Sequence, residues 1–259
     1  MTSRYPIVLA HGLMLRDIQF FKAFGRIEKI LKTEGFVVYT ADTDGVGTIE
    51  NNAAQLAAFV EDILKKEGVD KVNIIAHSKG GLDTRYMIDR LGMGDKVASV
   101  TFLCTPHKGS QIATKLYKLP KWIKGFIAFW INVWYRIFGD KKPDVLEVCR
   151  QLQTAPDGVL EDADNSDGIF MQSFSSTLKR SRDDFVMGIP LKFSRKYEKG
   201  ESDGMVSVES SKFAEYRGNC TDGSVSHTEI VDFMVRRKKK EKIYAFYVGI
   251  CEELANRGF

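Results

Sequence analysis

The sequence lacks the features that mark several classes of protein. Its four cysteines lie far apart and form no C-x-x-C pair, so neither a disulfide framework nor a paired-cysteine metal or redox site is indicated. Charge of one sign is also scarce, because 38 basic and 34 acidic side chains leave a net charge of +4. This balance argues against disorder and, without a recognisable nucleic-acid motif, against a nucleic-acid partner.

Long apolar runs and a leader are absent as well. The uncharged aromatic stretch from Gly125 to Tyr135 has 11 residues, well short of the roughly 20 of a membrane-spanning helix, so we expect no transmembrane segment. The first residues, MTSRYPIVLAHG, show no basic and apolar leader. Localisation therefore stays open between a cytoplasmic protein and a secreted one whose leader was removed.

Short apolar segments that alternate with amphipathic ones make up the first 106 residues. We expect strands at 6–10, 36–40, 72–76 and 97–103, and helices at 20–31, 49–66 and 80–91. This alternation predicts an α/β fold with a mostly parallel central sheet and helices on both faces. With 259 residues, 44% of them hydrophobic, we expect one domain over 1–259.

The alternation stops after Pro106, and the next expected strand is at 185–193. A segment this long without a strand is typically helical or functional, so we interpret residues 108–181 as an inserted helical cap or lid. A last helix is expected at 241–256.

The segment Ala76-His77-Ser78-Lys79-Gly80-Gly81 connects the third expected strand to a helix. Strand, tight turn, serine and helix form a nucleophile elbow, which exposes a serine hydroxyl next to a base. The alternative is that Ser78 only caps the helix. Two backbone N–H groups could stabilise an oxyanion: that of Leu13, after His11-Gly12 at the end of the first strand, and that of Lys79. The alternative for His11-Gly12 is a plain strand-ending turn.

A base and an acid should follow the serine along the chain in this architecture. His227 lies after the expected cap in a polar loop and is the candidate base, although a lone histidine there could simply neighbour a helix. Asp203, in Ser202-Asp203-Gly204, is the candidate acid, and Asp222 is the second choice because it lies only five residues before His227. His77 is set aside because a residue next to the serine points the wrong way on the turn.

The chain resembles the bacterial lipases of the α/β-hydrolase superfamily, the lactonizing-type true lipases and their smaller relatives. The motifs that carry the resemblance are YPIVLAHGL, AHSKGG, TPHKGS, SDGMVS and SHTEIVD, in the family's order. The resemblance implies a serine ester hydrolase with a triad of Ser78, Asp203 and His227 and an oxyanion hole made by Leu13 and Lys79.

The resemblance also leaves a structural calcium open. Larger members are similar in placing calcium beside the catalytic histidine, with an aspartate two positions after it, where this sequence has Glu229. No redox or organic cofactor is required for the chemistry.

All three tryptophans lie in the expected cap, within residues 120–138. The candidate lid residues are Trp122, Phe126, Phe129, Trp130 and Trp134. They could form a helix buried against the core. Our sharper hypothesis is a lid that covers the Ser78 cleft in water and turns toward a lipid–water interface. The basic run 236–240 favours a solvated helix face, with weak attraction to anionic lipid as the alternative.

The sequence thus predicts a carboxylic ester hydrolase, most simply a lipase acting on acylglycerols. A short-chain carboxylesterase is the nearest alternative, and a hydrolase-fold protein that binds lipid without turnover is a third.

Overall fold

The computed structural model describes residues 3–15, 17, 22–153, 168–184, 186–197 and 200–259. In this part of the chain the sheet has six strands in the order β2-β1-β3-β4-β5-β6, and every neighbouring pair is parallel. Its strands are β1 (Ile7–Ala10), β2 (Val38–Thr40), β3 (Val72–His77), β4 (Val97–Leu103), β5 (Phe170–Ser175) and β6 (Glu215–Asn219).

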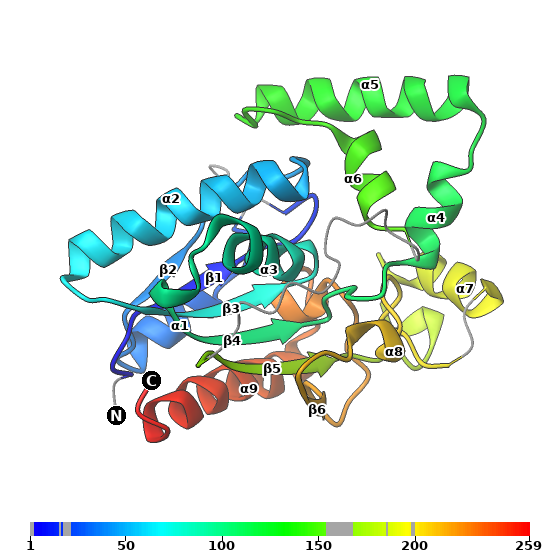
Figure 1. The fold of residues 1–259 in the computed structure, drawn as a ribbon. Helices are drawn as coiled ribbons and strands as arrows, with labels where there is room; N and C mark the ends of the chain where they lie inside the picture. The colour runs from blue at the N-terminus through cyan, green and yellow to red at the C-terminus, as the bar shows by residue number, and fades with distance from the viewer. Residues whose placement is uncertain (1–2, 16, 18–21, 154–167, 185, 198–199) are drawn as a thin grey trace.

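Helices surround this sheet, and the two chain ends lie close together (Figure 1), where the Arg4 N–H donates to the carbonyl oxygen of Phe259 at 2.7 Å. The helices are α1 (Ile27–Thr33), α2 (Ile49–Glu67), α3 (Lys79–Leu91), α4 (Gln111–Tyr117), α5 (Lys121–Ile137), α6 (Val145–Gln151), α7 (Gly188–Tyr197), α8 (Val208–Ser211) and α9 (Arg237–Asn256). Short 3-10 helices lie at Gly94–Lys96, Ser181–Asp183 and Glu229–Val231.

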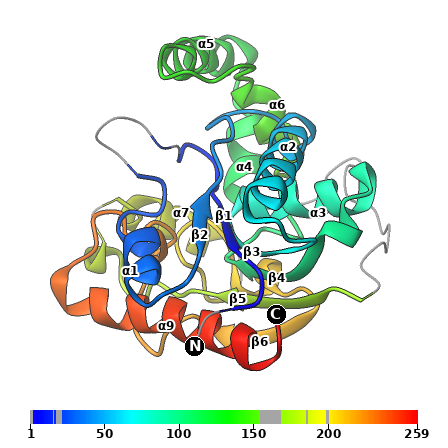
Figure 2. The same cartoon turned by 90° about the vertical axis from the view of Figure 1, so that its left-hand side faces the viewer.

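Two hydrophobic cores form because alternate strand residues point to opposite faces of the sheet. In β1, Ile7 and Leu9 pack with α1 and α9, whereas Val8 and Ala10 pack with α2 and α3. Figure 2 shows α1 and α9 on one side of the sheet and α2 and α3 on the other. Strands β1, β3 and β4 are buried along their whole length because both faces of the sheet are covered there.

The predicted α/β fold is confirmed, and the first four strands and the helices at 49–67 and 79–91 lie where we expected them. The first helix begins only at Ile27, after the buried Phe24, and the last begins at Arg237 rather than at residue 241. Phe20 and Phe21, which we placed in the first helix, lie outside the described residues.

Two expectations about the second half of the chain are wrong. The segment 185–193 was expected as a strand, but residues 188–197 form α7; residue 185 lies outside the described part. The fifth strand is instead β5, at 170–175, which pairs with β4 and lies inside the range that we assigned to the cap. The described helices that leave the sheet are α4, α5 and α6, at 111–151, so the segment 108–181 is not one uninterrupted insertion.

Helix α5 projects from the body of the protein, held above it by α4 and α6 (Figure 1 and Figure 2). Two carboxylates fasten its C-terminal end to the loop between β2 and α2. Asp140 accepts hydrogen bonds from the N–H groups of Gly45 and Val46, and Asp44 accepts from those of Lys141 and Lys142. We call these four hydrogen bonds the reciprocal clamp. None of the described helices is long and apolar enough to cross a membrane.

Candidate active site

Ser78 lies at the sharp turn between β3 and α3, as the elbow motif predicts. Its backbone has φ 54° and ψ −129°, a strained conformation for a residue with a side chain. Glycine at position 80 is required because a Cβ there would lie 2.5 Å from the carbonyl oxygens of Ala10 and His11. The turn thereby brings the start of α3 against the end of β1, next to the expected oxyanion donors.

The structure brings Ser78, His227 and Asp203 into one hydrogen-bonded chain. The Nε2 atom of His227 lies 2.9 Å from Oγ of Ser78, and its Nδ1 atom lies 2.7 Å from Oδ2 of Asp203. Ser78, His227 and Asp203 are buried, at 8%, 7% and 1% exposure. Ser78 and His227 nevertheless line a cavity, and Asp203 contacts His227. A carboxylate, an imidazole and a hydroxyl in this order are the geometry of a serine nucleophile with its base.

A tight turn fixes Asp203. Its Oδ1 atom accepts hydrogen bonds from the N–H groups of Met205 and Val206 at 2.9 and 2.8 Å, so Oδ2 is left to face His227. The His227 N–H also donates to the Asp203 carbonyl oxygen at 3.0 Å. The second-choice acid, Asp222, is exposed and pairs with Lys242 instead.

The two expected oxyanion donors lie beside Ser78. Leu13 lines the same cavity as the serine, and Lys79 is the first residue of α3, where backbone N–H groups have no carbonyl partner within the helix. Gly12 touches the nucleophile, since a Cβ at position 12 would lie 2.6 Å from Cβ and 3.2 Å from Oγ of Ser78. The Lys79 side chain points away into the core, where it pairs with Asp83 at 2.7 Å.

A cavity of about 540 Å³ contains Ser78 and His227, and its walls are mostly apolar. Helix α4 supplies Ile112, Ala113 and Leu116, α6 supplies Cys149, and Leu152 follows α6. The remaining apolar lining consists of Leu13, Met14, Leu15, Pro106, Met187, Met205, Val206 and Phe233.

The five aromatic residues of α5 are not among the residues that line this cavity. Trp122, Phe126, Phe129, Trp130 and Trp134 are 48–77% exposed, and Ala128 is the buried residue of the helix. In the structure α5 is therefore neither a helix buried against the core nor a lid that covers Ser78. The reason is that α4 and α6 form the wall of the cavity, while the reciprocal clamp holds α5 outside it.

One functional residue was missed by the sequence analysis. His77 does lie next to the serine, but its Nε2–H donates to the backbone carbonyl of His227 at 3.0 Å, and the two rings are 4.6 Å apart. Burial, followed by the nearby His227, lowers the pKa of His77 well below its ordinary value, so the ring is neutral. The available signal for this contact was one histidine in the elbow, next to Ser78, and a second histidine in the late loop.

The candidate acid and base belong to the group with metal-ligand geometry that the described residues contain. It consists of Cys104, Asp203 and His227. A hydrogen bond with Cys220, and then burial, raise the pKa of the Cys104 thiol well above its usual range.

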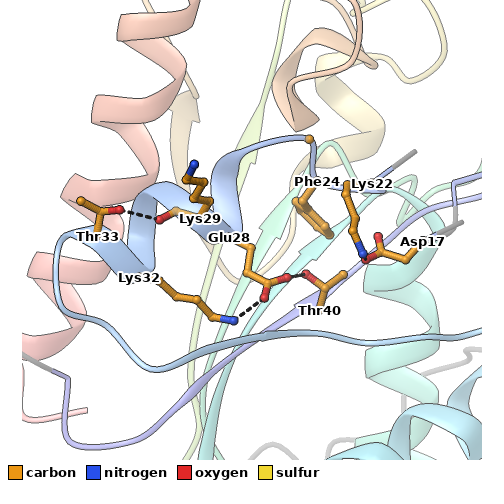
Figure 3. Close-up of a pocket in the computed structure, with 9 residues that line it drawn as sticks. Asp17, Lys22, Phe24, Glu28, Lys29, Lys32, Thr33 and Thr40 are labelled. Atoms are coloured by element: carbon orange, nitrogen blue, oxygen red, sulfur yellow. Dashed lines mark hydrogen bonds and ion pairs between the residues drawn. The ribbon is translucent and has the colours of Figure 1, made fainter. Parts of the chain in front are cut away.

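A second cavity, of about 420 Å³, lies beside α1 and contains no residue of the hydrogen-bonded chain (Figure 3). Two ion pairs lie in it: Lys22 pairs with Asp17, and Lys32 pairs with Glu28, which also accepts from Thr40. We therefore take the Ser78 cavity as the active site.

The parallel sheet, the elbow and the Ser78–His227–Asp203 chain define a serine hydrolase of the α/β-hydrolase superfamily. The chain belongs to the palmitoyl protein thioesterase family, because that family's sequence model matches residues 6–154, more than half of its length.

Curated relatives and solved structures agree with this class. Triacylglycerol lipase 2 of Saccharomyces cerevisiae is 29% identical over 254 residues, covering 90% of this chain and 73% of the yeast protein. A triacylglycerol lipase of Vibrio cholerae is 41% identical over 112 residues, covering 43% of this chain but only 35% of the Vibrio protein. The mature lipase BlEst2 of Bacillus licheniformis has the same fold, with a TM-score of 0.69, 21% identity and coverage of 98% of this chain and 93% of that one.

A metagenomic carboxyl esterase, with a TM-score of 0.74 and 14% identity, also shares the fold over 97% of this chain and 76% of its own. Together with the family match, these similarities identify the protein as a hydrolase of the lipase and carboxylesterase class.

Proposed function

We propose that the protein is a lipase that hydrolyses the ester bonds of acylglycerols. The observation that carries this proposal is the hydrogen-bonded chain from Asp203 through His227 to Ser78, next to an apolar cavity. The triacylglycerol lipases among its relatives support the substrate class.

In the proposed reaction the Ser78 hydroxyl attacks the ester carbonyl, and Nε2 of His227 accepts its proton. Asp203 holds the imidazole by its Nδ1–H and stabilises the imidazolium that forms. The Leu13 and Lys79 N–H groups donate to the oxyanion of the tetrahedral intermediate. His227 then returns the proton to the leaving alcohol, and water, activated by the same histidine, releases the fatty acid from Ser78. These steps balance without a redox or organic cofactor.

The lining of the cavity supports an acyl chain as the part of the substrate that enters the protein. Each methylene that leaves water for an apolar wall gains about 0.8 kcal/mol, so the side chains of α4 and of the segment after α6 would favour longer acyl chains. We expect hydrolysis to persist on long chains for this reason.

The exposed face of α5 supports contact with a lipid surface. It carries all three tryptophans, and residues 111–139 contain five basic side chains (Lys115, Lys118, Lys121, Lys124 and Arg136) and no acidic one. Tryptophan beside lysine is favoured at the boundary between headgroups and acyl chains, and the positive charge attracts anionic lipid. We propose that α5 lies on the lipid surface while α4 and α6 lead from it to Ser78.

Hydrolysis of p-nitrophenyl esters from two to sixteen carbons tests the function, with Ser78→Ala as the matched variant. If the protein is a lipase, turnover should persist on the long-chain esters and should disappear in S78A. A steep fall beyond six to eight carbons would instead identify a short-chain carboxylesterase. If a fluorophosphonate probe fails to label Ser78 in the wild-type protein, the hydrolase mechanism is wrong and the protein binds lipid without turnover.

A further inference from the structure

His227 lies inside a small hydrogen-bonded ring. The Ser226 N–H donates to Oε2 of Glu229 at 3.0 Å, and the Glu229 N–H donates to Oγ of Ser226 at 3.2 Å. This reciprocal pair is a capping box, S-x-x-E, and His227 is one of the two residues that it encloses. The position of the imidazole therefore depends on Ser226 and Glu229.

Two side chains from outside the loop fasten this box. The Ser226 hydroxyl donates to Oδ2 of Asp184 at 2.5 Å, and the Lys239 ammonium on α9 donates to the same Oε2 atom of Glu229 at 2.5 Å. Glu229 is 1% exposed, so its charge has no access to bulk water. Lys239 is the cation that pairs with it.

This is also the position where similar lipases are implied to place calcium, two residues after the histidine. The carboxylates here do not fit that ion. Calcium takes six to eight oxygen ligands at 2.3–2.6 Å. The Oε2 atom of Glu229 already accepts two N–H donors, and both oxygens of Asp184 accept from Val186, Met187 and Ser226. Among the described residues, neither Glu229 nor Asp184 belongs to a group with metal-ligand geometry.

We infer that Lys239 is a positioning residue for His227, whose ammonium supplies from within the chain the positive charge that calcium supplies in similar lipases. The inference rests on the proposed function. Burial raises the pKa of Glu229 despite the opposing effect of Lys239, which indicates how strongly this carboxylate depends on a cation. Lys239 thus holds Glu229, Glu229 accepts from the Ser226 N–H, and this contact fixes the position of the His227 imidazole.

Lys239→Met tests this role, with Lys239→Arg as the conservative variant and Lys238→Met as the control. Lys238 neighbours Lys239 on α9, is exposed, and forms no ion pair with any described residue. We expect K239M to lower kcat on dissolved p-nitrophenyl butyrate by about tenfold with KM within about twofold, because the base is displaced while the cavity is unchanged. K239R should restore most of kcat, and K238M should match the wild type.

The pH profile separates positioning from simple loss of stability. In K239M, the charged group of the described residues that is left facing Glu229 is Asp184, a like charge. The pKa of Glu229 should rise further, so kcat should fall with increasing pH as this carboxyl ionises, at a higher pH than in the wild type. Adding Glu229→Gln to K239M should remove that step and recover kcat, because the amide oxygen still accepts from Ser226 and needs no cation.

The inference fails if folded K239M keeps the wild-type kcat and pH profile, or if Glu229→Gln does not rescue it. It also fails if excess EDTA lowers the melting temperature or kcat of the wild type and calcium restores them. Failure of the proposed function is distinct, because S78A would then keep its activity and Ser78 would not react with a fluorophosphonate. In K239M the same probe should label Ser78, only more slowly.

Discussion

Nε2 of His77 donates a hydrogen bond to the backbone carbonyl of His227 at 3.0 Å, from directly beside the nucleophile Ser78. Two residues that are 150 positions apart are thereby joined at the reacting centre. The neutral His77 ring thereby supports the backbone of the histidine that we propose as the base.

Replacing His77 should therefore slow catalysis without blocking substrate. In His77→Phe the buried carbonyl of His227 loses its donor, and we expect kcat to fall by about tenfold with little change in KM. His77→Gln, which keeps an N–H donor, should lose less. Steady-state kinetics on a dissolved ester checks this, and equal kcat values for H77F and the wild type would contradict it.

Gly12 should tolerate no side chain. A Cβ at this position would lie 2.6 Å from Cβ of Ser78, so Gly12→Ala must displace the nucleophile or the adjacent oxyanion donor. We expect a loss in kcat of about a hundredfold. Gly249→Ala on the exposed face of α9 is the control, because a Cβ there meets nothing within 4 Å. That variant should keep its activity and gain roughly 0.5–1 kcal/mol of helix stability.

Asp83 should make stability depend on pH between about 4 and 6. Burial raises its pKa from 3.8 to about 6, even though Lys79 opposes the shift. The folded state therefore binds a proton more tightly than the unfolded state, so this group's contribution is fully present below about pH 4 and is lost as the pH rises to about 6. The full difference corresponds to on the order of 3 kcal/mol.

Urea unfolding of the wild type and of Asp83→Asn across this pH range measures that loss. The free energy of unfolding of the wild type should fall relative to D83N as the pH rises from about 4 to about 6, and the difference should then stay constant. Parallel curves throughout would show that Asp83 does not titrate in this range.

The exposed aromatic residues of α5 should matter for lipid and not for stability. The triple variant Trp122→Ser, Trp130→Ser and Trp134→Ser removes side chains that are 48–77% exposed, so the melting temperature should stay nearly unchanged. Flotation with anionic phospholipid vesicles should be reduced, and so should the ratio of activity on emulsified to dissolved ester. Unchanged vesicle binding would exclude α5 as the lipid contact.

The sequence predicted the strands in which apolar residues predominate. The run Val97–Leu103 reads as a buried parallel strand and is one. Strand β5, FMQSFS, was missed because it buries polar residues: Gln172 donates to Thr101, and Ser173 donates to the carbonyl oxygen of Phe213. Its partners come from distant parts of the chain, so no local pattern reveals it. The segment 185–193 was expected as a strand, although Pro190 fits the first turn of a helix, which is where it lies in α7.

The residues of the candidate site were easier to predict from the sequence than the residues that hold them in place. Ser78, Asp203 and His227 each lie in a turn or loop that the sequence marks with glycine or polar residues, and the structure brings them within hydrogen-bond distance. The contacts of His77 and Lys239 depend on where the loop around His227 lies in space, which periodicity does not specify. The S-x-x-E pattern at 226–229 was a local signal that could have indicated the box around His227.

The four hydrogen bonds of the reciprocal clamp join the C-terminal end of α5 to the loop between β2 and α2, and none of them involves the loop that holds His227. The outer face of α5 can therefore vary in sequence without moving the reacting groups. If α5 is the lipid contact that we propose, surface preference and turnover are separately evolvable traits. Exchanging its exposed aromatic residues between relatives would change the preferred interface, while Tyr135 keeps its hydrogen bond to the carbonyl oxygen of Met14 in the Ser78 cavity.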